Sequence, residues 1–203
     1  VHRAVAFALE RKMAGASPTV DETIEVFRAA WRSAGHLSPE HEVARREQGE
    51  AALRAFHERE IAAGPVPAAV EHPFRLPLGD VLLTGRIDRV DEDAAGTMLV
   101  DYKTAEVDEE ERAGQRAQED LQLSVYALAW RAMTGRIPER VELRYVTAGT
   151  SGTAVMTEGR IEKTREKLAE VAEKIRAGMF PARPSEYACR RCACRPICSQ
   201  SAV

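Results

Sequence analysis

The segment that most restricts the fold of this chain is 98–104, which reads Met-Leu-Val-Asp-Tyr-Lys-Thr. Three apolar residues precede the acid, so we expect a buried strand near the centre of a sheet. Side chains alternate between the two faces of a strand, which places Asp101 and Lys103 on one face and Tyr102 on the other. Buried charges are costly unless they are paired or bind a metal. The segment therefore predicts either a structural ion pair or a catalytic site.

A second aspartate is expected opposite Asp101. Residues 81–91 and 98–104 both have strand-like spacing, and a short polar turn separates them. The midpoint between Asp88 and Asp101 is also the centre of that turn, so the simplest antiparallel register makes them direct neighbours, roughly 5 Å apart at Cβ. Two carboxylates that close repel each other. A magnesium or manganese ion, which prefers oxygen ligands, would remove the repulsion.

The spacing of apolar residues divides the remainder of the chain into helices and strands. Residues 1–62 have helical spacing, and Ser38 and Pro39 are typical of a helix start. The acidic stretch 106–120 is expected to be a loop. After the first strand, 70–78, and the two strands above, we expect a helix at 121–133, a strand at 141–147, a fifth strand at 153–157 and a helix at 160–176 with Ile161, Leu168, Val171 and Ile175 inward.

These elements predict an α/β fold with a mixed β-sheet flanked by helices. We expect a single domain over 1–203, with a helical region at 1–68, a catalytic core at 69–180 and a cysteine tail at 181–203. The first residue is not methionine, which suggests a fragment of a longer protein.

Charge and hydropathy exclude several classes of protein. The net charge is −3, whereas proteins that coat nucleic acid are usually basic. No apolar stretch approaches the ~20 residues that span a bilayer. Charged residues interrupt the first apolar run, so no signal peptide is expected. We therefore expect a cytoplasmic protein without a membrane contact.

All four cysteines lie close together near the end of the chain, at Cys189, Cys192, Cys194 and Cys198. A disulfide framework would distribute its cysteines through the fold, so a metal or cluster site is the better interpretation. A four-thiolate zinc site and a set of reduced thiols are the alternatives. The stretch is also locally basic, and it could contact phosphates or simply be solvated; the arginines are Arg183, Arg190, Arg191 and Arg195.

Several separated motifs together resemble the RecB-type PD-(D/E)xK nucleases, the nuclease domains of bacterial recombination helicases. The matching segments are 1–3 (VHR), 85–91 (GRIDRVD), 100–104 (VDYKT), 122–126 (QLSVY) and 178–181 (GMFP) leading into Cys189. Their order and spacing agree with the family over almost the whole chain. The resemblance implies a restriction-endonuclease-like core and metal-dependent cleavage of DNA, mostly single strands delivered by a helicase, in end processing and recombination repair.

The resemblance also implies roles for individual residues. Metal ligands would be His2, Asp88 and Asp101, with Lys103 catalytic. Gln122 would support Lys103 or a phosphate, and Tyr126 would contact DNA or pack against the site. Glu71 lies where the family often has a glutamate, and a purely structural role is equally expected.

The cysteine spacing matches three ligands of the [4Fe-4S] cluster that some family members carry: Cys189, Cys192 and Cys198. The fourth ligand of those proteins lies upstream of the first motif. Cys194 departs from the family pattern and would be the fourth ligand only if it replaces that residue.

Two other functions remain open. One is a stand-alone nuclease of the related CRISPR spacer-acquisition type. The other is a catalytically silent DNA-binding scaffold, which the presence of Asp88, Asp101 and Lys103 disfavours. A structural zinc module would leave the first 188 residues without a role.

Overall fold

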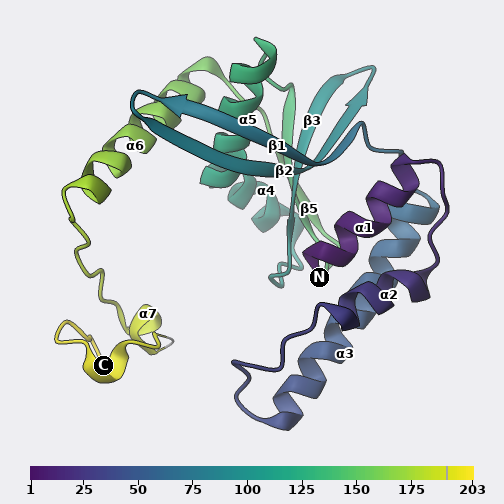
Figure 1. Ribbon diagram of the computed structural model, residues 1–203, viewed down its shortest axis with the longest axis horizontal. Coiled ribbons are helices and arrows are strands. Elements are labelled where there is room, and N and C mark those ends of the chain that lie inside the picture. The colour runs from purple at the N-terminus through teal and green to yellow at the C-terminus, as the bar shows by residue number, and fades with distance from the viewer. Residues whose placement is uncertain (191) are drawn as a thin grey trace. The chain divides into compact units, whose positions relative to one another are not determined.

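The computed structural model describes residues 1–190 and 192–203 (Figure 1). The chain divides into two compact units, Val1–Arg165 and Glu166–Val203. None of the described helices is long and apolar enough to span a membrane. The helices are α1 (His2–Met13), α2 (Val20–Ala29), α3 (Pro39–Phe56), α4 (Glu110–Glu119), α5 (Leu121–Thr134), α6 (Glu158–Arg176) and α7 (Glu186–Arg190), with a π-helical turn η1 (His57–Ala62) and a 3-10 turn η2 (Arg195–Ile197).

The first unit contains a mixed sheet, as predicted. Its strands lie in sequence order, and β3 is central. The first three strands form the predicted antiparallel meander, β3 and β4 are parallel, and β4 and β5 are antiparallel. The parallel step requires a crossover, which α4 and α5 supply. The strands are β1 (Ala69–Leu78), β2 (Val81–Asp93), β3 (Gly96–Lys103), β4 (Arg140–Tyr145) and β5 (Ser151–Ala154).

The register between β2 and β3 confirms the prediction from the turn. Arg89 pairs with Val100, and the ladder continues to Asp93 and Gly96 at the turn. One further step in the same register places Asp88 across from Asp101. Likewise, the β1 pairs on either side of Glu71 place that residue across from Asp88. Three acidic residues therefore lie in one row across three adjacent strands.

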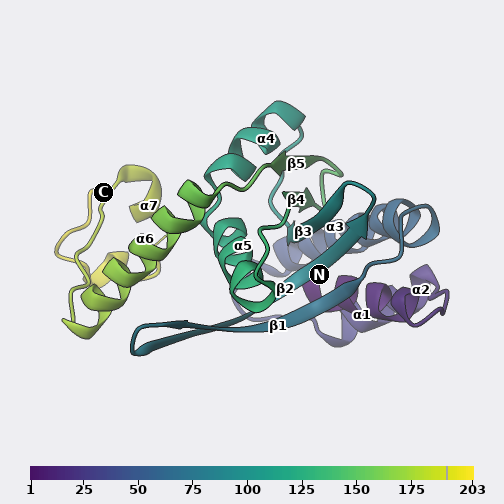
Figure 2. The ribbon, with the colours of Figure 1, turned by 90° about the horizontal axis from the view of Figure 1, so that it is seen from above.

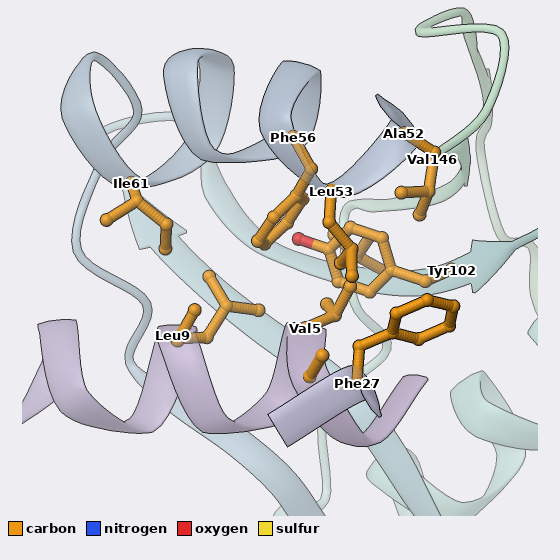
Figure 3. Packing of buried hydrophobic residues seen from close by; sticks show 12 residues of the cluster. Val5, Leu9, Phe27, Ala52, Leu53, Phe56, Ile61, Tyr102 and Val146 are labelled. Carbon is orange, nitrogen blue, oxygen red and sulfur yellow. The ribbon is translucent and has the colours of Figure 1, made fainter. Parts of the chain in front are cut away.

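The N-terminal helices cover one face of the sheet. Leu9 of α1, Phe27 of α2 and Phe56 of α3 pack around Tyr102 (Figure 3). Tyr102 is 2% exposed, and its ring meets the edge of Phe56 at 5.9 Å between centroids. The core thus holds Tyr102 on the helical face and leaves Asp101 and Lys103 on the other, as the strand alternation predicts.

Helix α5 covers the opposite face (Figure 2). Asp120 caps its start by accepting a hydrogen bond from the Leu123 backbone N–H at 2.8 Å. Gly135 ends it with a φ of 76°, the left-handed conformation that glycine adopts most readily. The ring of Tyr126 packs against Phe74 of β1. These contacts bring the first turn of α5, which contains Gln122, over the row of acidic residues.

Three sequence predictions are wrong in detail. The fifth strand, expected at 153–157, lies at Ser151–Ala154. The stretch expected to be a loop at 106–120 contains helix α4, because Ala113 and Ala117 form a narrow buried stripe among its charged residues. That stripe lies against β5: a Cβ at Gly152 would come within 2.0 Å of the Ala113 carbonyl oxygen. Gly152 therefore allows α4 to pack closely against β5, because it has no side chain between them.

The predicted inward stripe of α6 is shorter than expected. Ile161 is fully buried, and Thr164 is buried beside it. Val171 and Ile175, which we expected inward, are 39% and 57% exposed. The buried face of α6 therefore ends near the boundary between the two units, and hydrophobic spacing alone does not reveal that boundary.

Candidate active site

The acidic row and the first turn of α5 form one hydrogen-bonded network. Gln122 is its centre: its Nε2 donates to Asp101 Oδ1 at 2.9 Å and to the Tyr126 hydroxyl at 2.9 Å, and its Oε1 accepts from Lys103 Nζ at 2.8 Å. The Tyr126 hydroxyl donates in turn to Asp88 Oδ1 at 3.2 Å. The four-residue spacing of Gln122 and Tyr126 on one helix face makes this possible. Five residues predicted from the sequence are therefore together.

Asp101 is the most constrained charge in this network. Its side chain is 2% exposed, and its Oδ2 is in ion-pair contact with the Lys103 ammonium group. Burial raises the pKa of Asp101 to about 6; Lys103 opposes the shift and Asp88 adds to it. A buried carboxylate beside a second carboxylate fits a position where a further cation binds.

Tyr126 stays a neutral hydrogen-bond donor. Burial and the neighbouring Asp88 carboxylate both raise its pKa above the ordinary value. The hydroxyl therefore keeps its proton at neutral pH and can donate it to Asp88. This bond, together with a hydrogen bond from the Tyr102 backbone N–H to Asp88 Oδ2 at 2.9 Å, fixes the orientation of the Asp88 carboxylate.

His2 reaches the same region from α1. Its Nε2 lies 2.7 Å from the Tyr102 carbonyl oxygen, which can only accept, so in this arrangement Nε2 carries a proton and Nδ1 has the free lone pair. A cavity of ≈ 10 Å³, room for about one water or ion, is lined by His2, Glu71 and Asp88 among others. His2 therefore faces one small space with Glu71 and Asp88, and Asp101 is not part of its lining.

Glu71 has an unusual backbone. Its φ is 48°, a left-handed conformation that non-glycine residues rarely adopt within a strand. Its carboxylate lies 3.6 Å from the Arg86 guanidinium group. Because strained residues gather at functional sites, this conformation favours a functional role over the purely structural one.

The site fits a hard divalent cation in its chemistry. Asp88, Asp101 and Glu71 offer carboxylate oxygens, the donors that magnesium and manganese prefer, and the Asp101 carboxylate is buried. Among the described residues, no three His, Cys, Asp or Glu side chains are already gathered into a metal site. The assignment of His2, Asp88 and Asp101 as metal ligands therefore stays a prediction.

Sequence comparison decides the family. The family model of the PD-(D/E)XK nuclease superfamily matches residues 1–199. The chain belongs to the PD-(D/E)XK nuclease superfamily. Its mixed sheet flanked by helices agrees with the restriction-endonuclease-like core of these nucleases, which confirms the predicted fold.

Two individual proteins are also similar. The Gene 69 protein of Mycobacterium phage L5 is 32% identical over 135 residues, which is 63% of this chain. The match covers 43% of the phage protein, so the chain spans less than half the length of this relative. The crystal structure of SSO0001 covers 98% of both chains at 13% identity and a TM-score of 0.45, a likeness too low to add to the argument.

The structure also contains a network that sequence reasoning missed, on the helical face of the sheet. Arg89 is fully buried and donates to Asp91 at 2.7 Å and to Glu60 at 2.8 Å. Arg144 bonds to Glu142 at 2.7 Å and to the same Glu60 oxygen at 2.9 Å. A signal exists in the sequence: β2 and β4 each carry an Arg and an acid two residues apart, and therefore on one face of the strand.

The cysteines form no disulfide: Cys189 is buried, Cys198 half-buried, and Cys192 and Cys194 are exposed. The backbone N–H of Cys192 donates to the Cys189 carbonyl at 3.2 Å. Arg191, part of the predicted basic stretch, lies outside the described residues. An iron–sulfur cluster on Cys189, Cys192 and Cys198, with or without Cys194, stays a prediction.

Proposed function

We propose that this chain is a magnesium- or manganese-dependent deoxyribonuclease that hydrolyses phosphodiester bonds in single-stranded DNA. The observation that carries the proposal is the buried Asp101 carboxylate, in ion-pair contact with Lys103 and in the same row as Asp88. When bound there, a divalent metal would polarise the phosphate and lower the pKa of an attacking water.

Lys103 is the residue that we assign to the phosphate. An ammonium group has three donors, and here one bonds to Gln122 and one faces Asp101. The third is available to a water or a phosphate oxygen, where a fixed positive charge stabilises the developing negative charge. Gln122 holds Lys103 and Asp101 in one geometry, so it is a positioning residue, and Tyr126 does the same for Asp88.

The biological setting is the remaining part of the proposal. The resemblance to RecB-type nucleases supports a helicase, in the same protein or in a partner, that delivers single strands for end processing and recombination repair. A stand-alone nuclease of the spacer-acquisition type is the alternative. The complete network of Asp88, Asp101, Lys103, Gln122 and Tyr126 argues against a silent scaffold.

The direct test is cleavage of labelled single-stranded DNA by the intact protein with magnesium or manganese. We expect Lys103→Ala to lower the rate by about 100-fold or more, the usual effect of losing one transition-state donor. Asp88→Ala and Asp101→Ala should abolish cleavage. The exposed Lys163 on α6 provides a matched control, and Lys163→Ala should cleave at the parent rate. Cleavage by Asp101→Ala at the parent rate would exclude the proposed site.

A further inference from the structure

A second pocket lies beside the candidate active site, and nothing above assigns it a role. It has a volume of ≈ 310 Å³, at the lower end of the range of small-ligand sites. Its lining comes from the N-terminus, from α2 and α3 with their connection, and from the segments that follow β3 and β4. The lining residues that carry the argument are His2, Trp31, His36, Arg45, Gln48 and Thr104. We call it the aromatic pocket.

One wall of the aromatic pocket is a stack of rings. The rings of Trp31 and His36 are nearly parallel, with 8° between their planes and 5.3 Å between centroids. The edge of Phe27 meets Trp31, also at 5.3 Å. Trp31 Nε1 donates to Glu42 at 2.8 Å, which fixes the ring in place. The wall is therefore an ordered stack of rings, in which Trp31 and His36 are both half-buried.

The polar part of the lining includes the guanidinium group of Arg45. Arg45 donates to Gln48 Oε1 at 2.6 Å and is exposed. Within residues 1–190 and 192–203, no carboxylate lies within ion-pair distance of Arg45; the nearby acid, Glu106, bonds to Gln48 instead. An unpaired guanidinium next to aromatic rings combines a partner for a phosphate with a surface on which a base can stack.

The aromatic pocket adjoins the row of acidic residues. His2 lines both this pocket and the small cavity that Asp88 borders. Thr104, which also lines the pocket, directly follows Lys103 in the chain. A DNA strand that reaches the acidic row past His2 would thus have a neighbouring nucleotide at the pocket entrance.

We propose that the aromatic pocket binds one unstacked base of the DNA strand being cleaved, against Trp31 and His36, while Arg45 contacts the adjacent phosphate. The inference rests on the proposed nuclease function and adds a substrate subsite to it. A base inside a duplex is already stacked and paired, so the pocket selects for single strands.

Tryptophan fluorescence tests the proposal without cleavage. The chain has two tryptophans, Trp31 and Trp130. The intact protein with Lys103→Ala is titrated with a short oligothymidylate in EDTA, and stacking on Trp31 should quench its emission. We expect quenching in the Trp130→Phe background and its loss in the Trp31→Phe background. An abasic oligonucleotide of equal length should not quench, because it offers phosphates without bases.

Variants of the lining then separate binding from chemistry. His36→Ala and Arg45→Ala should each weaken oligothymidylate binding by roughly tenfold, as loss of a stacking or phosphate contact does, and raise KM for cleavage with little change in kcat. Arg46→Ala changes the neighbouring exposed arginine on α3 and should match the parent.

The outcomes distinguish this inference from the function on which it rests. If the parent cleaves single-stranded DNA but Trp31 is not quenched, or if the abasic strand quenches equally, the base subsite is wrong and the nuclease stands. If Trp31 is quenched only by the strand that carries bases, the subsite is supported even where the parent shows no cleavage, and the proposed function alone fails.

Discussion

Asp101 combines burial with negative charge, a combination that a folded protein tolerates only for a reason. Its carboxylate lies across from Asp88, and burial raises its pKa to about 6. The Lys103 ammonium group compensates in part. The remaining electrostatic repulsion disappears when a cation binds or when Asp101 is protonated. The ionised Asp101 should therefore lower the free energy of unfolding of the metal-free protein at neutral pH.

We therefore expect Asp101→Asn to stabilise the metal-free protein at pH 7. The pKa of Asp101 is higher in the folded protein than the unfolded value of about 3.9. Its contribution to the free energy of unfolding is therefore fully present below pH ~4 and is lost as the pH rises through about 6. The gain should reach up to about 3 kcal/mol at pH 7 and vanish near pH 4. Thermal unfolding in EDTA across this range measures it.

The exposed Asp108→Asn is the control for that experiment, and it should show no such pH dependence. A constant difference between Asp101→Asn and the parent from pH 4 to pH 7 would show that the carboxylate is not under this electrostatic cost.

Glu71 makes a second prediction, from its backbone rather than its charge. At a φ of 48°, any residue with a Cβ atom is strained, whereas glycine adopts this conformation readily. We expect Glu71→Gly to be more stable than Glu71→Ala by about 1 kcal/mol, in urea unfolding. Arg75, exposed on the same strand, is the matched site, and there alanine should be the more stable variant. If the alanine variant were the more stable one at both Glu71 and Arg75, the left-handed conformation of Glu71 would be contradicted.

At the scale of elements, η1 and two strands are joined through buried ions. Glu60 of η1 accepts hydrogen bonds from Arg89 of β2 and from Arg144 of β4. Lys12 of α1 donates to the backbone carbonyls of Glu60 and Ile61 at 2.7 Å and so satisfies the end of the π-helical turn. The π-helical turn therefore fixes the N-terminal helices, which carry His2, to the sheet.

Removing Glu60 should be costly. In Glu60→Ala, the fully buried Arg89 and the largely buried Arg144 lose a shared carboxylate, and breaking a buried ion pair typically costs about 3–5 kcal/mol. Glu58 lies in the same turn but is exposed, so Glu58→Ala should change stability by less than about 0.5 kcal/mol. Urea unfolding midpoints compare the two variants. Similar midpoints would show that the network contributes no net stability.

At the scale of the molecule, the parts that could be predicted are those that local rules determine. The β2–β3 register follows from the position of a turn, and the faces of Asp101 and Tyr102 follow from strand alternation. Gln122 and Tyr126 follow from helical spacing together with the family resemblance. These rules reached the hydrogen-bonded network around Gln122 and the meander.

The parts that could not be predicted depend on contacts distant in the chain. Helix α4 exists because Ala113 packs against Gly152, and its acidic composition conceals that contact. Glu60 meets Arg89 across 29 residues and Arg144 across 84, and no local pattern pairs them. The left-handed backbone of Glu71 arises within a strand, and Pro73, two residues later, does not by itself predict it.

Calorimetric titration of manganese into the metal-free intact protein tests the central claim most directly, that Asp88 and Asp101 hold a divalent metal beside Lys103. We expect the parent and Lys103→Ala to bind manganese, because the lysine acts on the phosphate, and Asp88→Ala and Asp101→Ala to lose that binding while they stay folded. A parent that binds no divalent metal, or an Asp101→Ala variant that binds manganese as the parent does, would contradict the account.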